Sequence, residues 1–304
     1  MKSNITASVI IPSYNSVETI EISLRYLLKQ TEINGINEII IVDSSDDGLT
    51  KDILSKFKNE KIIIIHSGKR IIPAIQRNLG AKKATGDVLL FIDSDAYPAF
   101  DWAEKILEAY ESGHLAGGGS YRLPEFQRKN NLAKAQYYLQ LNEFIDRGKK
   151  RFKKILPSCN FFCDRKLFLK LGGFPEIRAT EDCLFSLKIN KLSKMVFLPD
   201  AIVHHIWRDE KRVFFEYQRL IGSYIYKYRK LHYKSFYYNR MTATFLLPAF
   251  LFIKFARINA RIILSGWPHF RNYIRSFPLF LKGLIYWGRG FLTASQDKNN
   301  NRLI

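Results

Sequence analysis

The first hundred residues alternate between short apolar runs and stretches with polar residues at regular spacing. Residues 88–92, Val-Leu-Leu-Phe-Ile, form an uninterrupted apolar run, which is typical of a strand covered on both faces. Comparable runs occupy residues 7–11, 38–42 and 62–65. Between them, Leu24, Leu27 and Leu28 and the stretch 77–84 have helical spacing. This alternation predicts an α/β domain with a mixed, mostly parallel sheet flanked by helices.

Polar side chains follow three of these four runs. Tyr14 and Asn15 come after the first run, Asp43 after the second, and Asp93 and Asp95 after the fourth. Open α/β sheets bind ligands beyond the carboxyl ends of their strands. We therefore expect a nucleotide to lie along this edge of the sheet.

Asp93 and Asp95 are separated by one residue, so two negative charges lie close together. Such carboxylates repel each other unless a positive charge lies between them. Mg²⁺ and Mn²⁺ take oxygen ligands, commonly one or two carboxylates together with the phosphates of a substrate. The pair predicts a divalent ion that holds a diphosphate, and the alternative is a solvated loop at the end of a strand.

Seven segments carry a resemblance to a known family. In chain order they are residues 9–15 (Val-Ile-Ile-Pro-Ser-Tyr-Asn), 41–48 (Ile-Val-Asp-Ser-Ser-Asp-Asp-Gly), 77–81 (Arg-Asn-Leu-Gly-Ala), 91–96 (Phe-Ile-Asp-Ser-Asp-Ala), 158–160 (Ser-Cys-Asn), 171–176 (Leu-Gly-Gly-Phe-Pro-Glu) and 180–182 (Thr-Glu-Asp). In this order and spacing they resemble glycosyltransferase family 2, which has the GT-A fold. The resemblance covers roughly residues 6 to 222 and implies an inverting, metal-dependent transferase that uses a nucleoside diphosphate sugar.

The resemblance assigns roles to individual residues. It implies nucleotide binding by Pro12, Tyr14, Asp43, Arg77 and Asp93, metal binding by Asp95, Asp93 and His204, catalysis by Asp182 as the base, and an acceptor region at Glu181. Three alternatives stay open: Asp43 as a turn-capping residue, Arg77 as a surface arginine, and His204 as a structural histidine. The loop at residues 43–48 departs from the usual Asp-Asp-Gly-Ser, so Asp46 and Asp47 are left with turn formation as their simplest role.

The chemistry of glycosyl transfer requires these residue types. The departing diphosphate gains negative charge, which a bound Mg²⁺ or Mn²⁺ stabilises. The attacking acceptor hydroxyl loses a proton, which a carboxylate can accept. UDP is the commonest carrier in the family, and GDP and dTDP are the alternatives.

Charge is distributed unevenly over the 304 residues, whose formal net charge is +20. Residues 211–304 hold 17 Lys and Arg against two acidic residues, a net charge of +15. We therefore predict a GT-A catalytic domain at residues 1–215 and a basic, aromatic helical region at 216–304.

Three cysteines in no disulfide pattern favour a reducing compartment, and a strand within the first ten or so residues argues against a signal peptide.

Residues 242–264 are long and apolar enough for a membrane-spanning helix. Lys254, Arg257 and Arg261 interrupt this stretch at spacings of three and four, so they share one helix face. A basic stripe opposite an apolar face is typical of helices in a membrane interface, where anionic lipids add attraction. We expect a peripheral or shallowly inserted protein at the cytoplasmic face of the membrane, with a lipid-linked sugar or glycan as acceptor.

Four alternatives remain. The helical region is a membrane span, or it is a structural cap of a soluble transferase that acts on protein or polysaccharide. A binding protein without catalysis is disfavoured by the intact Asp93, Asp95 and Asp182. Basic residues among aromatics also suit nucleic acid. Here, however, the charge accompanies long apolar runs, which nucleic-acid binding does not require, so no nucleic-acid partner is expected.

Overall fold

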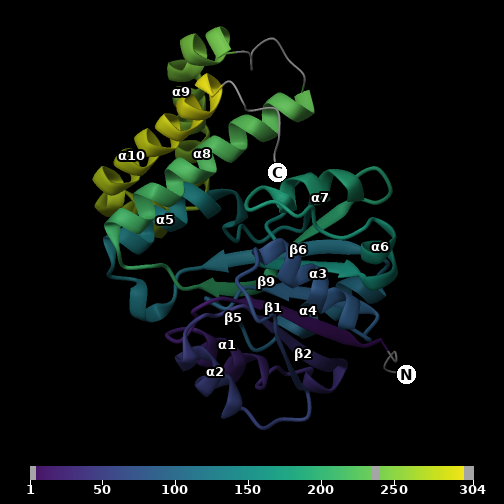
Figure 1. Cartoon of the computed structure of the whole chain (residues 1–304). Helices are drawn as coiled ribbons and strands as arrows, with labels where there is room; N and C mark the ends of the chain where they lie inside the picture. Colours follow the sequence, from purple (N-terminus) through teal and green to yellow (C-terminus); the bar gives the residue numbers. More distant parts are fainter. Residues whose placement is uncertain (1–4, 234–239, 298–304) are drawn as a thin grey trace. The chain divides into compact units, whose positions relative to one another are not determined.

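The computed structural model describes residues 5–233 and 240–297 and divides into two compact units (Figure 1). The first unit comprises residues 1–122 and 146–206, and the second comprises residues 123–145 and 207–304. The sequence pattern did not indicate that residues 123–145 belong with the carboxyl-terminal helices. The division at residue 215 stays a prediction for the catalytic domain.

The first unit is built around one nine-stranded sheet in the order β3-β2-β1-β4-β8-β6-β9-β5, with β7 paired to β9. The strands are β1 (Ala7–Ser13), β2 (Ile36–Asp43), β3 (Ile62–His66), β4 (Val88–Ile92), β5 (Ala96–Pro98), β6 (Ala116–Arg122), β7 (Arg151–Lys153), β8 (Asn160–Asp164) and β9 (Met195–His205). Strands β3, β2, β1 and β4 are parallel, and β8 then pairs antiparallel with β4. The α/β class and the mixed sheet are confirmed, and the parallel pairings lie among the four strands predicted from apolar runs and between β6 and β9.

Helices and short turns connect these strands. The α-helices are α1 (Ile20–Leu27), α2 (Gly48–Ser55), α3 (Pro73–Lys83), α4 (Trp102–Glu111), α6 (Arg165–Lys170) and α7 (Glu181–Ile189), and η1 (Ile33–Gly35) is a 3₁₀ turn. Helix α3 lies close to the sheet at Gly80, where a Cβ atom would come within 2.6 Å of the Ile10 side chain. Helix α3 therefore packs directly against β1, and its Arg77 side chain reaches Asp93, the residue after β4.

The register of the parallel strands sets the edge at which the site forms. Ser13 of β1 pairs with Asp43 of β2, and Asp43 pairs with His66 of β3. Their strand ends therefore lie side by side, as the sequence predicts for parallel strands with polar ends. Residues 88–92 are completely buried, in agreement with a strand covered on both faces.

The second unit is helical. It contains η2 (Glu125–Gln127), α5 (Asn131–Leu141), η3 (Asn142–Phe144), α8 (Lys211–Tyr233), α9 (Arg240–Leu264) and α10 (Trp267–Gln296) (Figure 1). Helices α8 and α10 approach closely at two glycines, because a Cβ on Gly222 would meet the Trp287 carbonyl and one on Gly290 would meet the Arg219 carbonyl. Tyr226, Trp287 and Phe291 form the centre of the apolar core of this unit.

Helix α9 presents an apolar face to solvent. Met241–Leu264 is the one stretch in the described residues with the length and composition to cross a membrane, and 11% of its most apolar window is buried. Phe245 is 85% exposed and Phe252 is 70% exposed. The predicted basic stripe of Lys254, Arg257 and Arg261 lines a cavity of the second unit. Arg257 is also exposed, so attraction of this stripe to anionic headgroups stays a prediction.

Candidate active site

Asp43 lies at the junction of β1, β2 and β3, and its carboxylate is fully buried. One oxygen accepts hydrogen bonds from the hydroxyl groups of Ser13, at 3.1 Å, and Ser45, at 2.6 Å. The other oxygen lies 3.2 Å from Nδ1 of His66, whose side chain is partly exposed. The Ser45 amide also donates to Asp43 at 3.3 Å, so the carboxylate shapes the turn after β2. Nucleoside binding by Asp43 stays a prediction.

Tyr14 and the acidic loop after β2 meet beside this junction. The Tyr14 hydroxyl donates to Asp46 at 3.1 Å, and the Arg70 guanidinium lies 4.3 Å from the centre of the Tyr14 ring. Hydrogen bonds from Asn15 and Tyr14 lower the pKa of Asp46. Asp47 caps α2 by accepting from the Thr50 amide at 2.9 Å, so the turn-forming role of Asp47 is confirmed.

Arg77 is buried on α3 and joins two acidic groups of the site. Its guanidinium pairs with Asp93 at 2.5 Å and with Glu181 at 3.0 Å. Its side chain is only 4% exposed, which excludes the surface alternative. The two carboxylates hold the pKa of Arg77 above its ordinary value despite burial. Arg77 therefore fixes the end of β4 to the beginning of α7.

Glu181 and Asp182 form the first turn of α7. Burial, followed by the charge of Asp182, raises the pKa of Glu181 to about 7, and the Arg77 charge opposes this shift. Burial also raises the pKa of Asp182, whose carboxylate accepts a 2.7 Å hydrogen bond from the Cys183 amide. A carboxylate with a raised pKa is a better proton acceptor at neutral pH.

Asp93 and Asp95 flank a candidate metal position. Ligand atoms of Asp93, Cys159 and His205 all lie within 4.8 Å of one another, and Asp95 lies 3.6 Å from Nε2 of His205. Burial and the charges of Asp93 and Asp95 raise the pKa of the Cys159 thiol well above its ordinary value, so it stays protonated. The remaining donors, two carboxylates and one imidazole, fit Mn²⁺ or Mg²⁺.

His205, and not the predicted His204, is the histidine of this cluster. Tyr97 pairs with His204 and Ala96 with His205 across strands β5 and β9. Side chains alternate between the two sides of a strand, so only one of the adjacent histidines faces Asp95. The His204 ring stacks on Tyr97, with centroids 4.8 Å apart, as expected of the structural alternative.

The sequence did not single out three residues that the structure places at this edge: His66, Cys159 and His205. The position of His66 beside Asp43 follows from the register of β3 against β2. Cys159 stands within the 158–160 segment but has no predicted role of its own, and the structure shows it free and buried. Its proximity to Asp93 depends on the folded chain, because 66 residues separate the two in sequence. Pro12 lies within β1 and is buried there.

A mixed α/β sheet with carboxylates, an imidazole and a buried arginine at the carboxyl edge of its parallel strands is the arrangement of a GT-A transferase. The sequence model of glycosyl transferase family 2 matches residues 8–172, which is more than half of the chain. The chain belongs to glycosyl transferase family 2.

Two glycosyltransferases are similar to more than half of the chain. Glycosyltransferase AglE of Haloferax volcanii is 27% identical over 55% of this chain and 55% of its own length. The UDP-Glc:alpha-D-GlcNAc-diphosphoundecaprenol beta-1,3-glucosyltransferase WfgD of Escherichia coli is 28% identical over 61% of this chain and 71% of its own. The chain thus matches only about half the length of the first relative.

Solved structures share the fold. The mannosyltransferase PcManGT of Pyrobaculum calidifontis, in complex with GDP-Man and Mn²⁺, has a TM-score of 0.62 at 17% identity and covers 98% of this chain and 89% of its own. GalNAc-T7 with UDP, GalNAc and Mn²⁺ has a TM-score of 0.56 at 19% identity, over 68% of this chain and 44% of its own. At these identities the likeness shows the GT-A fold and no more.

Proposed function

We propose that this chain transfers a sugar from a nucleoside diphosphate sugar to a hydroxyl group of a lipid-linked or glycan acceptor at the cytoplasmic face of the membrane. The observation that carries the proposal is the ion-pair bridge from Arg77 to both Asp93 and Glu181. It brings together the end of the acidic strand and the start of the helix that holds Asp182. UDP is the proposed carrier, because WfgD is named for a UDP-sugar donor.

Asp93, Asp95 and His205 would hold the divalent ion. When bound, the ion would stabilise the negative charge that develops on the departing diphosphate. Arg77 keeps one carboxylate oxygen of Asp93 in place by its ion pair. Tyr14 and Asp43 belong to the strand ends at which the nucleoside would lie.

Asp182 is the proposed base. The acceptor oxygen attacks the anomeric carbon as its proton passes to the Asp182 carboxylate. The bond from the anomeric carbon to the diphosphate oxygen breaks, and its electron pair leaves with the diphosphate. A single displacement of this kind inverts the configuration at the anomeric carbon. Glu181, next in the chain and held by Arg77, would border the acceptor.

The apolar face of α9 supports membrane association over the alternative of a structural cap. A cap would bury its apolar side chains, whereas Phe245 and Phe252 are largely exposed. The name of WfgD describes a lipid-linked acceptor, which agrees with the proposed action at a membrane.

A donor panel tests the proposed activity. Purified protein is incubated with UDP-, GDP- and dTDP-sugars in Mn²⁺, and release of each nucleoside diphosphate is measured with and without added membrane lipid extract. We expect one carrier to be cleaved and the sugar to appear in the lipid fraction. Absence of donor cleavage and transfer under all of these conditions would contradict the proposal.

A further inference from the structure

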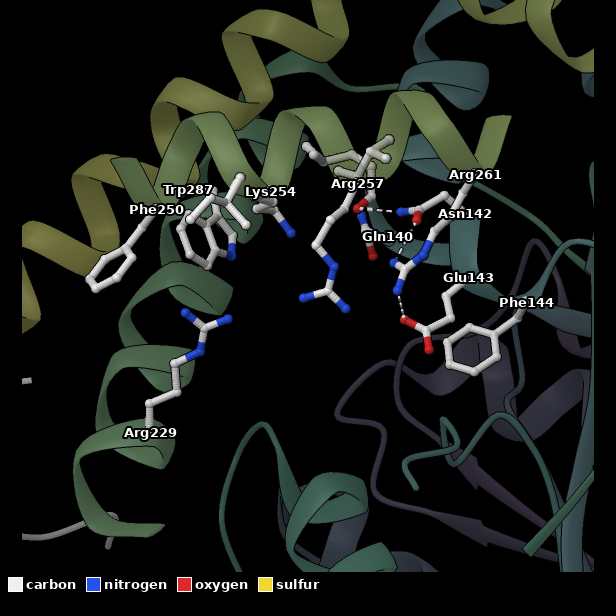
Figure 2. Close-up of a pocket in the computed structure, with 13 residues that line it drawn as sticks. Gln140, Asn142, Glu143, Phe144, Arg229, Phe250, Lys254, Arg257, Arg261 and Trp287 are labelled. Carbon is white, nitrogen blue, oxygen red and sulfur yellow. Dashed lines mark hydrogen bonds and ion pairs between the residues drawn. The ribbon is translucent and has the colours of Figure 1, made fainter. Parts of the chain in front are cut away.

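A cavity of about 500 Å³ lies within the second unit, between α5, η3, α8, α9 and α10 (Figure 2). Its volume is in the range of small-molecule binding sites. None of the residues proposed for sugar transfer lines it. Nothing in the family resemblance assigns a function to it.

The cavity is lined by four cationic side chains and one carboxylate. The cations are Arg229, Lys254, Arg257 and Arg261, and the carboxylate is Glu143. Figure 2 shows Arg229, Lys254 and Arg257 pointing toward a common space, with Arg261 turned to Glu143. The lining therefore carries a surplus of three positive charges when all groups are ionised.

The single carboxylate is already engaged. Arg261 pairs with Glu143 at 2.7 Å and donates to the Asn142 side-chain oxygen at 3.1 Å. Within residues 5–233 and 240–297, neither Arg229 nor Arg257 forms an ion pair. Two guanidinium groups thus remain available to an anion, and Arg fits phosphate oxygens with paired donors.

Lys254 shows the effect of this crowding. Its ammonium lies 4.8 Å from the centre of the Trp287 ring. Burial, followed by the charges of Arg229, Arg261 and Arg257, lowers the pKa of Lys254 to about 8. A bound anion would offset this repulsion, because an opposite charge favours the ionised form.

The cavity borders the apolar face of α9. Phe245 precedes Lys254 by nine residues, which at about 100° per residue places the two on opposite faces of the helix. Ile253 lies between these faces: it lines the cavity and is 51% exposed. A molecule with an anionic head and a hydrocarbon chain would find a partner for each part along this rim.

We propose that Arg229, Lys254 and Arg257 bind the phosphate or diphosphate group of a membrane amphiphile. This inference rests on the proposed function, since it assigns the anionic group of a lipid-linked acceptor to the second unit. The guanidinium groups donate to the phosphate oxygens, and the chain of the amphiphile leaves along Ile253.

Calorimetric titration of the full chain tests the proposal. Farnesyl diphosphate is the probe, with inorganic pyrophosphate and farnesol as its separated head and tail. The buffer contains EDTA, which suppresses binding of the diphosphate through a metal at the acidic strand. We expect farnesyl diphosphate to bind more tightly than either part.

The variant Arg229→Gln/Arg257→Gln should weaken farnesyl diphosphate binding by about 10-fold or more, since it removes two charged donors. The matched control is Arg212→Gln/Arg271→Gln, which removes two exposed arginines of the same unit outside the cavity and should keep wild-type affinity. If the double variant fails to fold, Arg257→Gln alone, at an exposed position, replaces it and should still weaken binding.

Three results would overturn the inference. Equal loss in both double variants would indicate general surface charge. Pyrophosphate binding as tightly as farnesyl diphosphate would indicate a soluble anion as the ligand. If farnesol bound as tightly as farnesyl diphosphate, and the variants changed neither affinity, the site would be apolar only. The titration contains no donor and no metal, so these failures would leave the sugar-transfer proposal standing.

Discussion

Arg77 donates a 3.0 Å hydrogen bond to Glu181, a residue 104 positions later in the chain. The same guanidinium pairs with Asp93, so one buried cation neutralises carboxylates from two distant segments. Removing one partner of a buried ion pair is strongly destabilising, because the other charges stay buried without compensation. The position of α7 relative to β4 should therefore depend on Arg77.

Arg77→Met should lower the free energy of unfolding by about 3–5 kcal/mol in urea titrations. The control is Arg25→Met, which removes an exposed pair with Glu21 at 2.7 Å and should cost about 0.3–0.5 kcal/mol. Equal and small losses in the two variants would show that the Arg77 bridge does not hold the site together.

Glu181 should make stability depend on pH. Its pKa is raised from 4.5 to about 7 in the folded protein by burial and by Asp182, so the folded state binds the proton more tightly than the unfolded state. The stability contributed by this group is fully present below pH 4.5 and is lost as the pH rises through about 7. Glu181→Gln should reduce the change in the free energy of unfolding between pH 4.5 and about 7, as measured by urea titrations at a series of pH values. An unchanged slope would contradict the raised pKa.

Asp182→Asn should separate binding from chemistry. The base acts only as the acceptor attacks, so donor affinity should stay near wild type while turnover falls by about 10²–10⁴-fold. Calorimetry of donor binding in Mn²⁺ is compared with the rate of sugar transfer in the same preparation. Lost donor affinity with retained turnover at saturation would place Asp182 in the nucleotide site.

The apolar face of α9 should hold the protein on membranes independently of lipid charge. Phe245→Ser/Phe252→Ser removes two exposed aromatic side chains and should weaken binding to neutral phosphatidylcholine vesicles by about 10-fold or more, since burial of each Phe supplies about 1.5–3 kcal/mol. Vesicle flotation measures the change. The control is Phe126→Ser on η2, which is 63% exposed and should leave flotation unchanged.

Wild-type protein that fails to float with neutral or anionic vesicles would refute the membrane proposal and favour the structural cap. Resistance to carbonate extraction from native membranes would instead favour a membrane span at residues 241–264.

The sequence predicted the parts of the site that depend on local pattern. Apolar runs identified β1 to β4, and their polar ends placed Asp43 and Asp93 at one edge. Arg77 was left open between the surface and the nucleotide, because its burial depends on Asp93 and Glu181 converging from distant segments.

The sequence pattern could not predict which histidine joins the metal cluster or that the basic face of α9 lines a cavity. The choice between His204 and His205 depends on the phase of β9 against β5, and adjacent histidines give no signal for it. The spacing of Lys254, Arg257 and Arg261 correctly predicted a shared face of α9. It did not predict that the face lines a cavity, because Arg229 and Glu143 come from other helices and turns.

The acidic edge of the sheet should bind a nucleoside diphosphate through a divalent ion. The decisive measurement is calorimetric binding of UDP, GDP and dTDP to the wild type and to Asp95→Asn, each in Mn²⁺ and in EDTA. We expect one nucleotide to bind the wild type only in Mn²⁺, and Asp95→Asn to weaken this binding by about 10²-fold, as loss of a charged ligand implies. Equal binding in EDTA, or wild-type affinity in Asp95→Asn, would contradict it.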